Sequence, residues 1–287
     1  MSARMTSFVN DGLEFDVVDT GPLDGEVVVL LHGFPQTASC WRSVAERLNA
    51  AGYRTIMPTQ RGYSPHARPK GRYAYRIAAL TGDIVALIGT LGVGPIHLVG
   101  HDWGATVAWA TAARHPHLIR TLTTVSVPHS GAFMRSMLRS NQALRSYYMA
   151  LFQIPRLPEL IVERRPAVMD TALERSGMDA ENIARVRAEV VESGALTGAL
   201  NWYRAIAIST PSALSATVPV ATTHVWGAQD IALARSGAEL TAQYVTGDYS
   251  LRVLPEATHW IPEQNPDQLT EIIIDRMKRA TPPDAPR

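Results

Sequence analysis

The segment HLVGHDWGA (residues 97–105) places an aspartate where a strand gives way to a helix. An apolar run ends at Gly100, the chain turns at Asp102, and a helical pattern starts near Gly104. This is the layout of a nucleophile elbow, G-x-Nuc-x-G, in which small flanking residues permit a tight turn that projects the central side chain above a sheet. The alternative is an ordinary βα turn whose aspartate caps the next helix. A second motif favours the nucleophile.

That second motif is LLHGFP (residues 30–35), which ends an earlier buried strand. In folds with such an elbow, this loop contributes one oxyanion-hole N–H, and the residue after the nucleophile contributes the other. The sequence therefore predicts an oxyanion hole made by the backbone amides of Phe34 and Trp103.

An acid and a histidine follow the nucleophile in the order that this arrangement requires. Asp230 lies in HVWGAQDIA, after a late strand, and His259 lies in EATHWIPEQNP, before the last helix. We expect both side chains to converge on Asp102. No H-E-x-x-H or comparable ligand spacing occurs, so the sequence predicts no metal site.

An aspartate nucleophile restricts the substrate. Attack on an acyl carbon would give an anhydride, whereas attack on a saturated carbon gives an ester that an activated water can hydrolyse. Electrophilic saturated carbons of this kind occur chiefly in epoxides and alkyl halides. A halide is a weak base and needs only donors that cradle it, but an epoxide oxygen leaves as an alkoxide and needs a proton donor.

Tyrosines could supply that proton. Tyr148 lies in SYYMALFQIP and Tyr203 in NWYRA. Tyr147 and Tyr148 are adjacent and face different ways on a helix, so only one of them can point into a site. Each tyrosine, taken alone, is as readily explained by amphipathic packing.

Strand and helix patterns alternate on both sides of a helical segment, which predicts an α/β fold with a mostly parallel sheet flanked by helices. We expect a core over residues 1–130, a helical cap insertion over 131–215, and the rest of the core over 216–287. Such sheets bind ligands at the carboxyl ends of their strands, so the cap should cover that edge. The strands expected are 13–21, 26–33, 53–59, 96–100, 119–128, 222–227 and 250–255, and the helices are 75–91, 105–114 and 266–279, with 136–152, 181–193 and 195–207 in the cap.

Composition excludes several classes of protein. The chain has 287 residues, 46% of them hydrophobic, and a net charge of +1, which gives no reason to expect nucleic acid or acidic membrane as a partner. Cys40 is the single cysteine, so no intramolecular disulfide can form. No signal peptide or membrane span is apparent in the sequence. A cytoplasmic protein is expected.

With these motifs in order, the chain resembles the epoxide hydrolases of the α/β-hydrolase fold, including the soluble mammalian type. The resemblance rests on HGFP, GHDWG, YYMALFQIP, NWYR, Asp230 and the HW pair at His259. It implies that Asp102 is the nucleophile and that Tyr148 and Tyr203 bind and protonate the epoxide oxygen, with Tyr147 as the alternative to Tyr148. It implies a small hydrophobic epoxide and water as reactants, and no cofactor.

Two alternatives stay open. Haloalkane dehalogenases share the elbow but often carry Asn where this chain has Phe34, and haloacetate dehalogenases typically carry Arg where Trp103 stands. A non-catalytic receptor of the same fold usually loses part of the catalytic set, and nothing is visibly lost here. The aromatic residues expected to contact substrate are Phe34, Trp103, Phe152 and Trp202. The sequence does not specify which epoxide is used or the oligomeric state.

Overall fold

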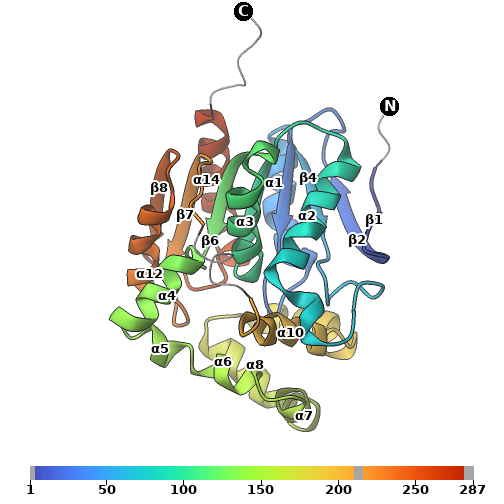
Figure 1. Ribbon diagram of the computed structural model, residues 1–287, viewed down its shortest axis with the longest axis vertical. Helices are drawn as coiled ribbons and strands as arrows, with labels where there is room; N and C mark the ends of the chain where they lie inside the picture. The colour runs from blue at the N-terminus through green and yellow to red at the C-terminus, as the bar shows by residue number, and fades with distance from the viewer. Residues whose placement is uncertain (1–3, 210–215, 281–287) are drawn as a thin grey trace, which may run out of the picture.

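A computed structural model describes residues 4–209 and 216–280 and is built around an eight-stranded sheet (Figure 1). The strand order is β1-β2-β4-β3-β5-β6-β7-β8, with β1 and β2 antiparallel to their neighbours and the other pairs parallel. The strands are β1 (Ser7–Asn10), β2 (Leu13–Thr20), β3 (Val27–Leu31), β4 (Arg54–Pro58), β5 (Ile96–His101), β6 (Ile119–Val125), β7 (Thr222–Gly227) and β8 (Tyr249–Leu254).

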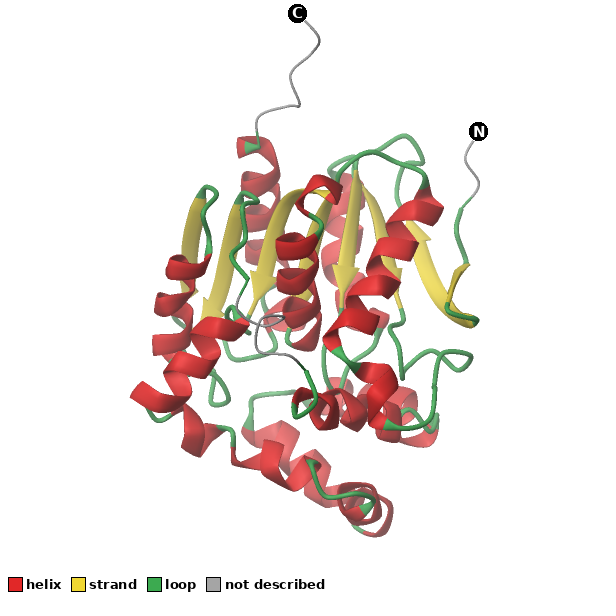
Figure 2. Ribbon diagram, in the orientation of Figure 1, coloured by secondary structure: helices red, strands yellow, loops and turns green. Residues whose placement is uncertain are grey.

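Helices cover both faces of the sheet (Figure 2). Val29 and Leu31 of β3 pack into the apolar cluster on the side of α2 (Ile77–Leu91) and α3 (Trp103–Arg114). Val28 and Leu30 pack on the other side, with α1 (Arg42–Ala50) and α14 (Pro266–Arg279). A strand buried on both faces has no polar alternation, which is why β3 reads as a continuous apolar run. Shorter helices are α12 (Arg235–Leu240), α13 (Ile261–Gln264) and the 3-10 turns Ala38–Trp41, Arg72–Tyr75, Pro116–Leu118 and Thr241–Tyr244.

Between β6 and β7 the described chain is helical and lies beyond the carboxyl ends of the strands (Figures 1 and 2). This confirms the predicted cap. The end expected for it, residue 215, lies outside the described residues. The cap helices are α4 (Ser130–Arg139), α5 (Gln142–Arg145), α6 (Tyr147–Phe152), α7 (Leu157–Arg164), α8 (Pro166–Arg175), α9 (Ala180–Val186), a π-helix (Arg187–Glu192) and α10 (Leu196–Ile206).

The stretch 136–152, expected to be helical, is divided among α4, α5 and α6. Ser140 is extended (φ −147°, ψ −172°), and its hydroxyl accepts a hydrogen bond from the Gln142 N–H at 3.2 Å. Serine side chains compete with the helix for backbone groups in this way, and apolar spacing alone does not register the competition.

The sequence analysis missed β1. It pairs with β2 through a turn in which Asp11 (φ 49°) and Gly12 (φ 73°) both have positive φ. An Asp-Gly pair between two strands is a strong hairpin signal, so the sequence contained the information.

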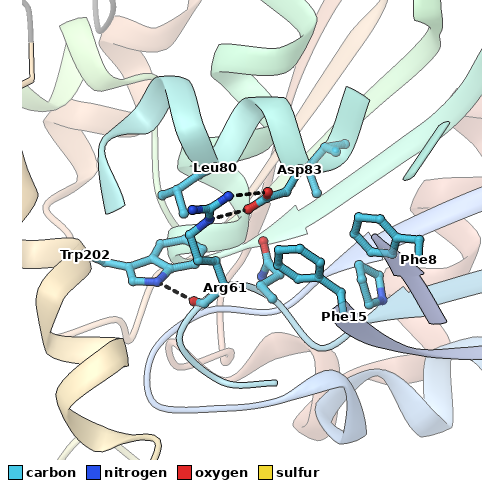
Figure 3. Close-up of a pocket in the computed structure, with 9 residues that line it drawn as sticks. Phe8, Phe15, Arg61, Leu80, Asp83 and Trp202 are labelled. Atoms are coloured by element: carbon cyan, nitrogen blue, oxygen red, sulfur yellow. Dashed lines mark hydrogen bonds and ion pairs between the residues drawn. The ribbon is translucent and has the colours of Figure 1, made fainter. Parts of the chain in front are cut away.

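α10 is fastened to the core at the loop that follows β4. Gly198 of α10 faces Gly62 so closely that a side chain on either one would overlap the other's backbone. The Trp202 indole N–H donates to the Arg61 carbonyl oxygen at 2.8 Å, and the Arg61 guanidinium forms a buried bidentate ion pair with Asp83 of α2 at 2.7 and 2.8 Å (Figure 3). The cap helix is therefore held to a loop that is itself fixed to the core.

Within residues 4–209 and 216–280, no helix is both long enough and apolar enough to cross a bilayer.

Candidate active site

Asp102 lies in the turn between β5 and α3, with φ 52° and ψ −120°. A positive φ is costly for a residue with a side chain, and such strain is characteristic of functional turns. Side chains at either neighbouring glycine would collide with backbone, since a Cβ on Gly100 would overlap the Gly104 carbonyl and a Cβ on Gly104 would overlap the Leu31 carbonyl. The two glycines thus permit the turn that holds the carboxylate above the sheet.

The Asp102 carboxylate has a different contact on each oxygen. Oδ1 accepts a hydrogen bond from the Phe34 N–H at 2.7 Å, and Oδ2 lies 3.5 Å from Nε2 of His259. The backbone N–H of Trp103 also favours the charged carboxylate and helps to lower the pKa of Asp102. Burial raises the pKa of Asp102, but the hydrogen bond and charge of His259 outweigh burial and hold the pKa below its usual value. The side chain is therefore ionised at neutral pH.

His259 bridges the two aspartates. Its Nδ1 lies 2.7 Å from Oδ2 of Asp230, whose Oδ1 accepts the N–H groups of Ala232 and Leu233 at 2.7 and 2.9 Å. Burial lowers the pKa of His259, but the charge of Asp230 and the hydrogen bonds to both carboxylates more than compensate and raise the pKa to about 10. The structure thus brings Asp102, His259 and Asp230 together in a buried, hydrogen-bonded row.

Two residues that the sequence analysis missed hold the backbone of His259. Its carbonyl oxygen accepts from the Ser126 hydroxyl at 2.8 Å and lies 2.9 Å from Nε2 of His101. Ser126 has a positive φ of 67°, which marks a second strained position beside the site. Burial lowers the pKa of His101 to about 4, so its ring is neutral, and Nε2 carries the hydrogen that the carbonyl accepts. The position of His101 next to Asp102 was the only signal in the sequence.

A cavity of about 270 Å³ opens beside Asp102, with Tyr148 and Tyr203 in its wall. The rings of the two tyrosines meet edge to face, with their centroids 6.1 Å apart. Tyr147, the alternative to Tyr148, is 75% exposed and does not line the cavity. Burial raises the pKa of both lining tyrosines, which keeps their protons in place.

The four aromatic residues expected to contact substrate take different places. Trp103 lines the cavity. Phe34 and Phe152 do not line it; they pack against the Tyr203 ring, with centroid distances of 5.3 and 5.0 Å. Trp202 does not line the cavity, contrary to expectation: its ring lies 5.7 Å from that of Trp103, and its N–H is bonded to the core (Figure 3).

Most of the cavity wall is apolar and was not predicted. Phe133 and Met137 are four residues apart on α4 and so share the face that points into the cavity. Met149 of α6 lines the cavity as well. The remaining lining residues are Thr106, Val127, Pro128, Ser130, Met134, Ile206 and Leu233.

Among the residues that the structure describes, no group of three or more His, Cys, Asp or Glu side chains could hold a metal ion. Cys40 is buried in the apolar cluster beside α1.

Comparison with known proteins agrees with this architecture. The profile of the alpha/beta hydrolase fold family matches residues 26–266. The AB hydrolase superfamily protein YfhM of Bacillus subtilis (strain 168) is 34% identical over 285 residues, covering 97% of this chain and 99% of that protein. Epoxide hydrolase 3 of Xenopus tropicalis is 31% identical over 280 residues, covering 94% of this chain and 76% of that protein.

Solved structures agree as well. Epoxide hydrolase A from Mycobacterium thermoresistibile superposes with a TM-score of 0.81 at 27% identity, covering 96% of this chain and 98% of that one. The Bacillus megaterium epoxide hydrolase, solved with an inhibitor, also gives 0.81, at 26% identity and 95% and 100% coverage. On the family profile, the relatives and the fold together, this chain belongs to the α/β-hydrolase fold family and resembles the epoxide hydrolases within it.

Proposed function

We propose that this protein hydrolyses a small hydrophobic epoxide to a vicinal diol through a covalent ester on Asp102. The observation that carries the proposal is the arrangement around one carboxylate. Oδ1 is held by the Phe34 N–H, and the carboxylate shares an apolar cavity with the hydroxyl-bearing Tyr148 and Tyr203. A nucleophile and two proton donors that share one cavity are what opening an epoxide requires.

In the first step, Oδ2 of Asp102 attacks the less hindered ring carbon. The bond between that carbon and the epoxide oxygen breaks, and the oxygen takes a proton from Tyr148 or Tyr203. This gives an ester, a hydroxyl group and a tyrosinate. Because burial raises the pKa of both tyrosines, the phenol keeps its proton until the strongly basic alkoxide develops.

The pKa of His259, about 10, means that the imidazole is protonated beside the ionised Asp102. Alkylation removes the charge of Asp102, and with it part of what raises that pKa. His259 then releases its proton, which returns through solvent to the tyrosinate. The reaction itself would therefore convert His259 from a counter-ion into a base.

In the second step, water attacks Cγ of Asp102 while His259 accepts one of its protons and Asp230 stabilises the resulting cation. Oδ1 becomes the oxyanion, and the Phe34 and Trp103 amides stabilise it. Collapse breaks the bond between Cγ and Oδ2. The proton of the added hydroxyl passes to the departing alkoxide, so the diol leaves and Asp102 is again ionised beside a protonated His259.

The relatives support the substrate class. Curated relatives named epoxide hydrolase are 28–31% identical over most of this chain, and superposable structures carry the same name. The relative with 34% identity bears only a fold-level name. The cap tyrosines therefore provide the argument from this chain itself for an epoxide over an alkyl halide.

The deciding assay offers styrene oxide and 1-chlorobutane side by side and measures diol and released chloride. We expect diol only. Chloride without diol would favour a dehalogenase, and neither product would favour a binding protein. His259→Gln should accumulate the ester, visible as the mass of one styrene oxide added to the intact protein. Normal turnover by His259→Gln would exclude the two-step scheme.

A further inference from the structure

The two cap tyrosines lie on separate helices, so the helices must be fixed relative to each other for both hydroxyls to reach one substrate atom. Tyr148 lies on α6, a six-residue helix in which no residue is fully buried, and Tyr203 lies on α10. A helix this short has little stability of its own. The position of Tyr148 must therefore be imposed by contacts from outside α6.

Arg204, the residue after Tyr203, makes those contacts. Its Nε donates to the carbonyl oxygen of Phe152 at 3.0 Å, and Nη2 donates to that of Ile154 at 3.2 Å. These carbonyls lie at and just beyond the end of α6, where helical carbonyls lack partners within the helix. A cation at this end also complements the helix dipole.

The same guanidinium reaches the start of α7. Nη1 and Nη2 donate to the two carboxylate oxygens of Glu159 at 2.7 and 2.9 Å, and both side chains are buried. Burial raises the pKa of Glu159, but the hydrogen bond and charge of Arg204, together with other hydrogen bonds to the carboxylate, outweigh burial and lower the pKa, so the carboxylate balances the buried cation. Arg204 is thus saturated with partners and does not line the cavity.

A second hydrogen bond links the end of α6 to α10. The Gln153 side-chain N–H donates to the Tyr203 carbonyl oxygen at 2.9 Å, and the Phe152 ring packs against both tyrosines, 5.5 Å from Tyr148 and 5.0 Å from Tyr203. Arg204, the residue after Tyr203, thus binds the end of α6, and Gln153 at the end of α6 binds Tyr203. Since α10 is fastened to the core through Trp202 (Figure 3), this clamp fixes α6 relative to the core as well.

We propose that Arg204 is a positioning residue that sets the placement of Tyr148 against Tyr203, and so controls the epoxide-opening step but not ester hydrolysis. The inference rests on the proposed function for its kinetic consequence. Its structural consequence, the placement of the two tyrosines, is independent of activity.

The kinetic test uses the His259→Gln background, in which only ester formation is measured, with styrene oxide and intact-protein mass spectrometry. Arg204→Met should form the ester about 10- to 100-fold more slowly, as expected when a reacting group is misplaced by about an ångström. The matched control is Arg54→Met, which breaks another buried bidentate pair, with Asp19 at 2.9 and 2.6 Å on strands β4 and β2. That control should stay within about twofold of the background rate.

The structural test is the NMR spectrum of protein with 13Cζ-labelled tyrosine, without substrate. The Tyr148 and Tyr203 signals should shift in Arg204→Met and stay in place in Arg54→Met. Should Arg204→Met fail to fold, Arg204→Lys decides by the same two readouts, because lysine keeps the charge but cannot reach both carbonyls and Glu159.

A folded Arg204 variant with unchanged tyrosine signals and an unchanged rate of ester formation would overturn the inference. The two proposals fail differently. Shifted tyrosine signals in a protein whose His259→Gln form never acquires an adduct would sink the proposed function and leave the positioning role standing.

Discussion

At the scale of single residues, the site is dominated by the coupling between Asp102 and His259. The two side chains are 3.5 Å apart and buried, so the charge of each controls the proton affinity of the other. Catalysis by the proposed scheme uses this coupling twice: the cation favours the nucleophilic carboxylate, and loss of the carboxylate charge then frees the base.

Asp102→Ala tests the coupling without substrate. Asp102 raises the pKa of His259 through a hydrogen bond and through its charge, and the substitution removes both. The pKa of His259 should therefore fall from about 10 by roughly 1–3 units. Nitrogen-15 NMR titration of labelled histidine measures it. Asp267→Asn, which removes a carboxylate exposed on α14, serves as the control and should leave the pKa of His259 in place. An unchanged value in Asp102→Ala would show that Asp230 alone holds the proton.

At the scale of elements, the contact between α10 and the loop after β4 sets where Tyr203 lies. Gly198→Ala would drive a methyl group into the Gly62 backbone, which neither side can relieve by moving a side chain. We expect a loss of about 1–3 kcal/mol in unfolding free energy and slower diol formation. Gly89→Ala in α2 meets nothing within 4 Å and should instead stabilise the protein by about 0.5–1 kcal/mol with activity intact. Chemical denaturation of both variants distinguishes packing at this contact from helix propensity, and equal stability changes would refute the contact's importance.

Some features of these elements could be predicted from the sequence, and others could not. The elbow at Asp102 and the loop at Phe34 are local features, set by small residues next to apolar strands, and their geometry could be predicted from neighbouring residues. The choice between Tyr147 and Tyr148 could not, since adjacent residues on one helix differ only in direction. That direction depends on the hydrogen bonds that Arg204 and Gln153 make between α10 and the end of α6. These bonds join residues 52 and 50 positions apart in the sequence. The inward face of α4 and the packing of Trp202 against the core, away from the cavity, depend on tertiary contacts in the same way.

At the scale of the whole molecule, the buried site ties folding to pH. His259 has a pKa of about 10 in the folded protein and about 6.5 when unfolded, so the native state binds the extra proton between these values. Its contribution to stability is complete below pH 6.5 and is lost as the pH rises through 10. We expect the unfolding free energy to fall by on the order of a few kcal/mol across this window, less steeply in His259→Gln. Urea denaturation at pH 7, 8, 9 and 10 measures this, and parallel profiles for both proteins would contradict it.

The hydrogen bond from the Phe34 amide to Oδ1 also bears on which classes of compound should not react with this protein. In a serine esterase the two backbone donors stand open and capture the carbonyl of an incoming ester. Here Oδ1 of the nucleophile itself occupies the Phe34 donor. A carboxylic ester, an amide or a phosphonate that enters the cavity finds the Phe34 donor already engaged, so we expect reagents that inactivate serine hydrolases to leave this protein unmodified. Under the proposed function, selectivity is thus part of the resting state: a substrate must react at a saturated carbon without polarisation by the Phe34 amide, as an epoxide does through its ring strain.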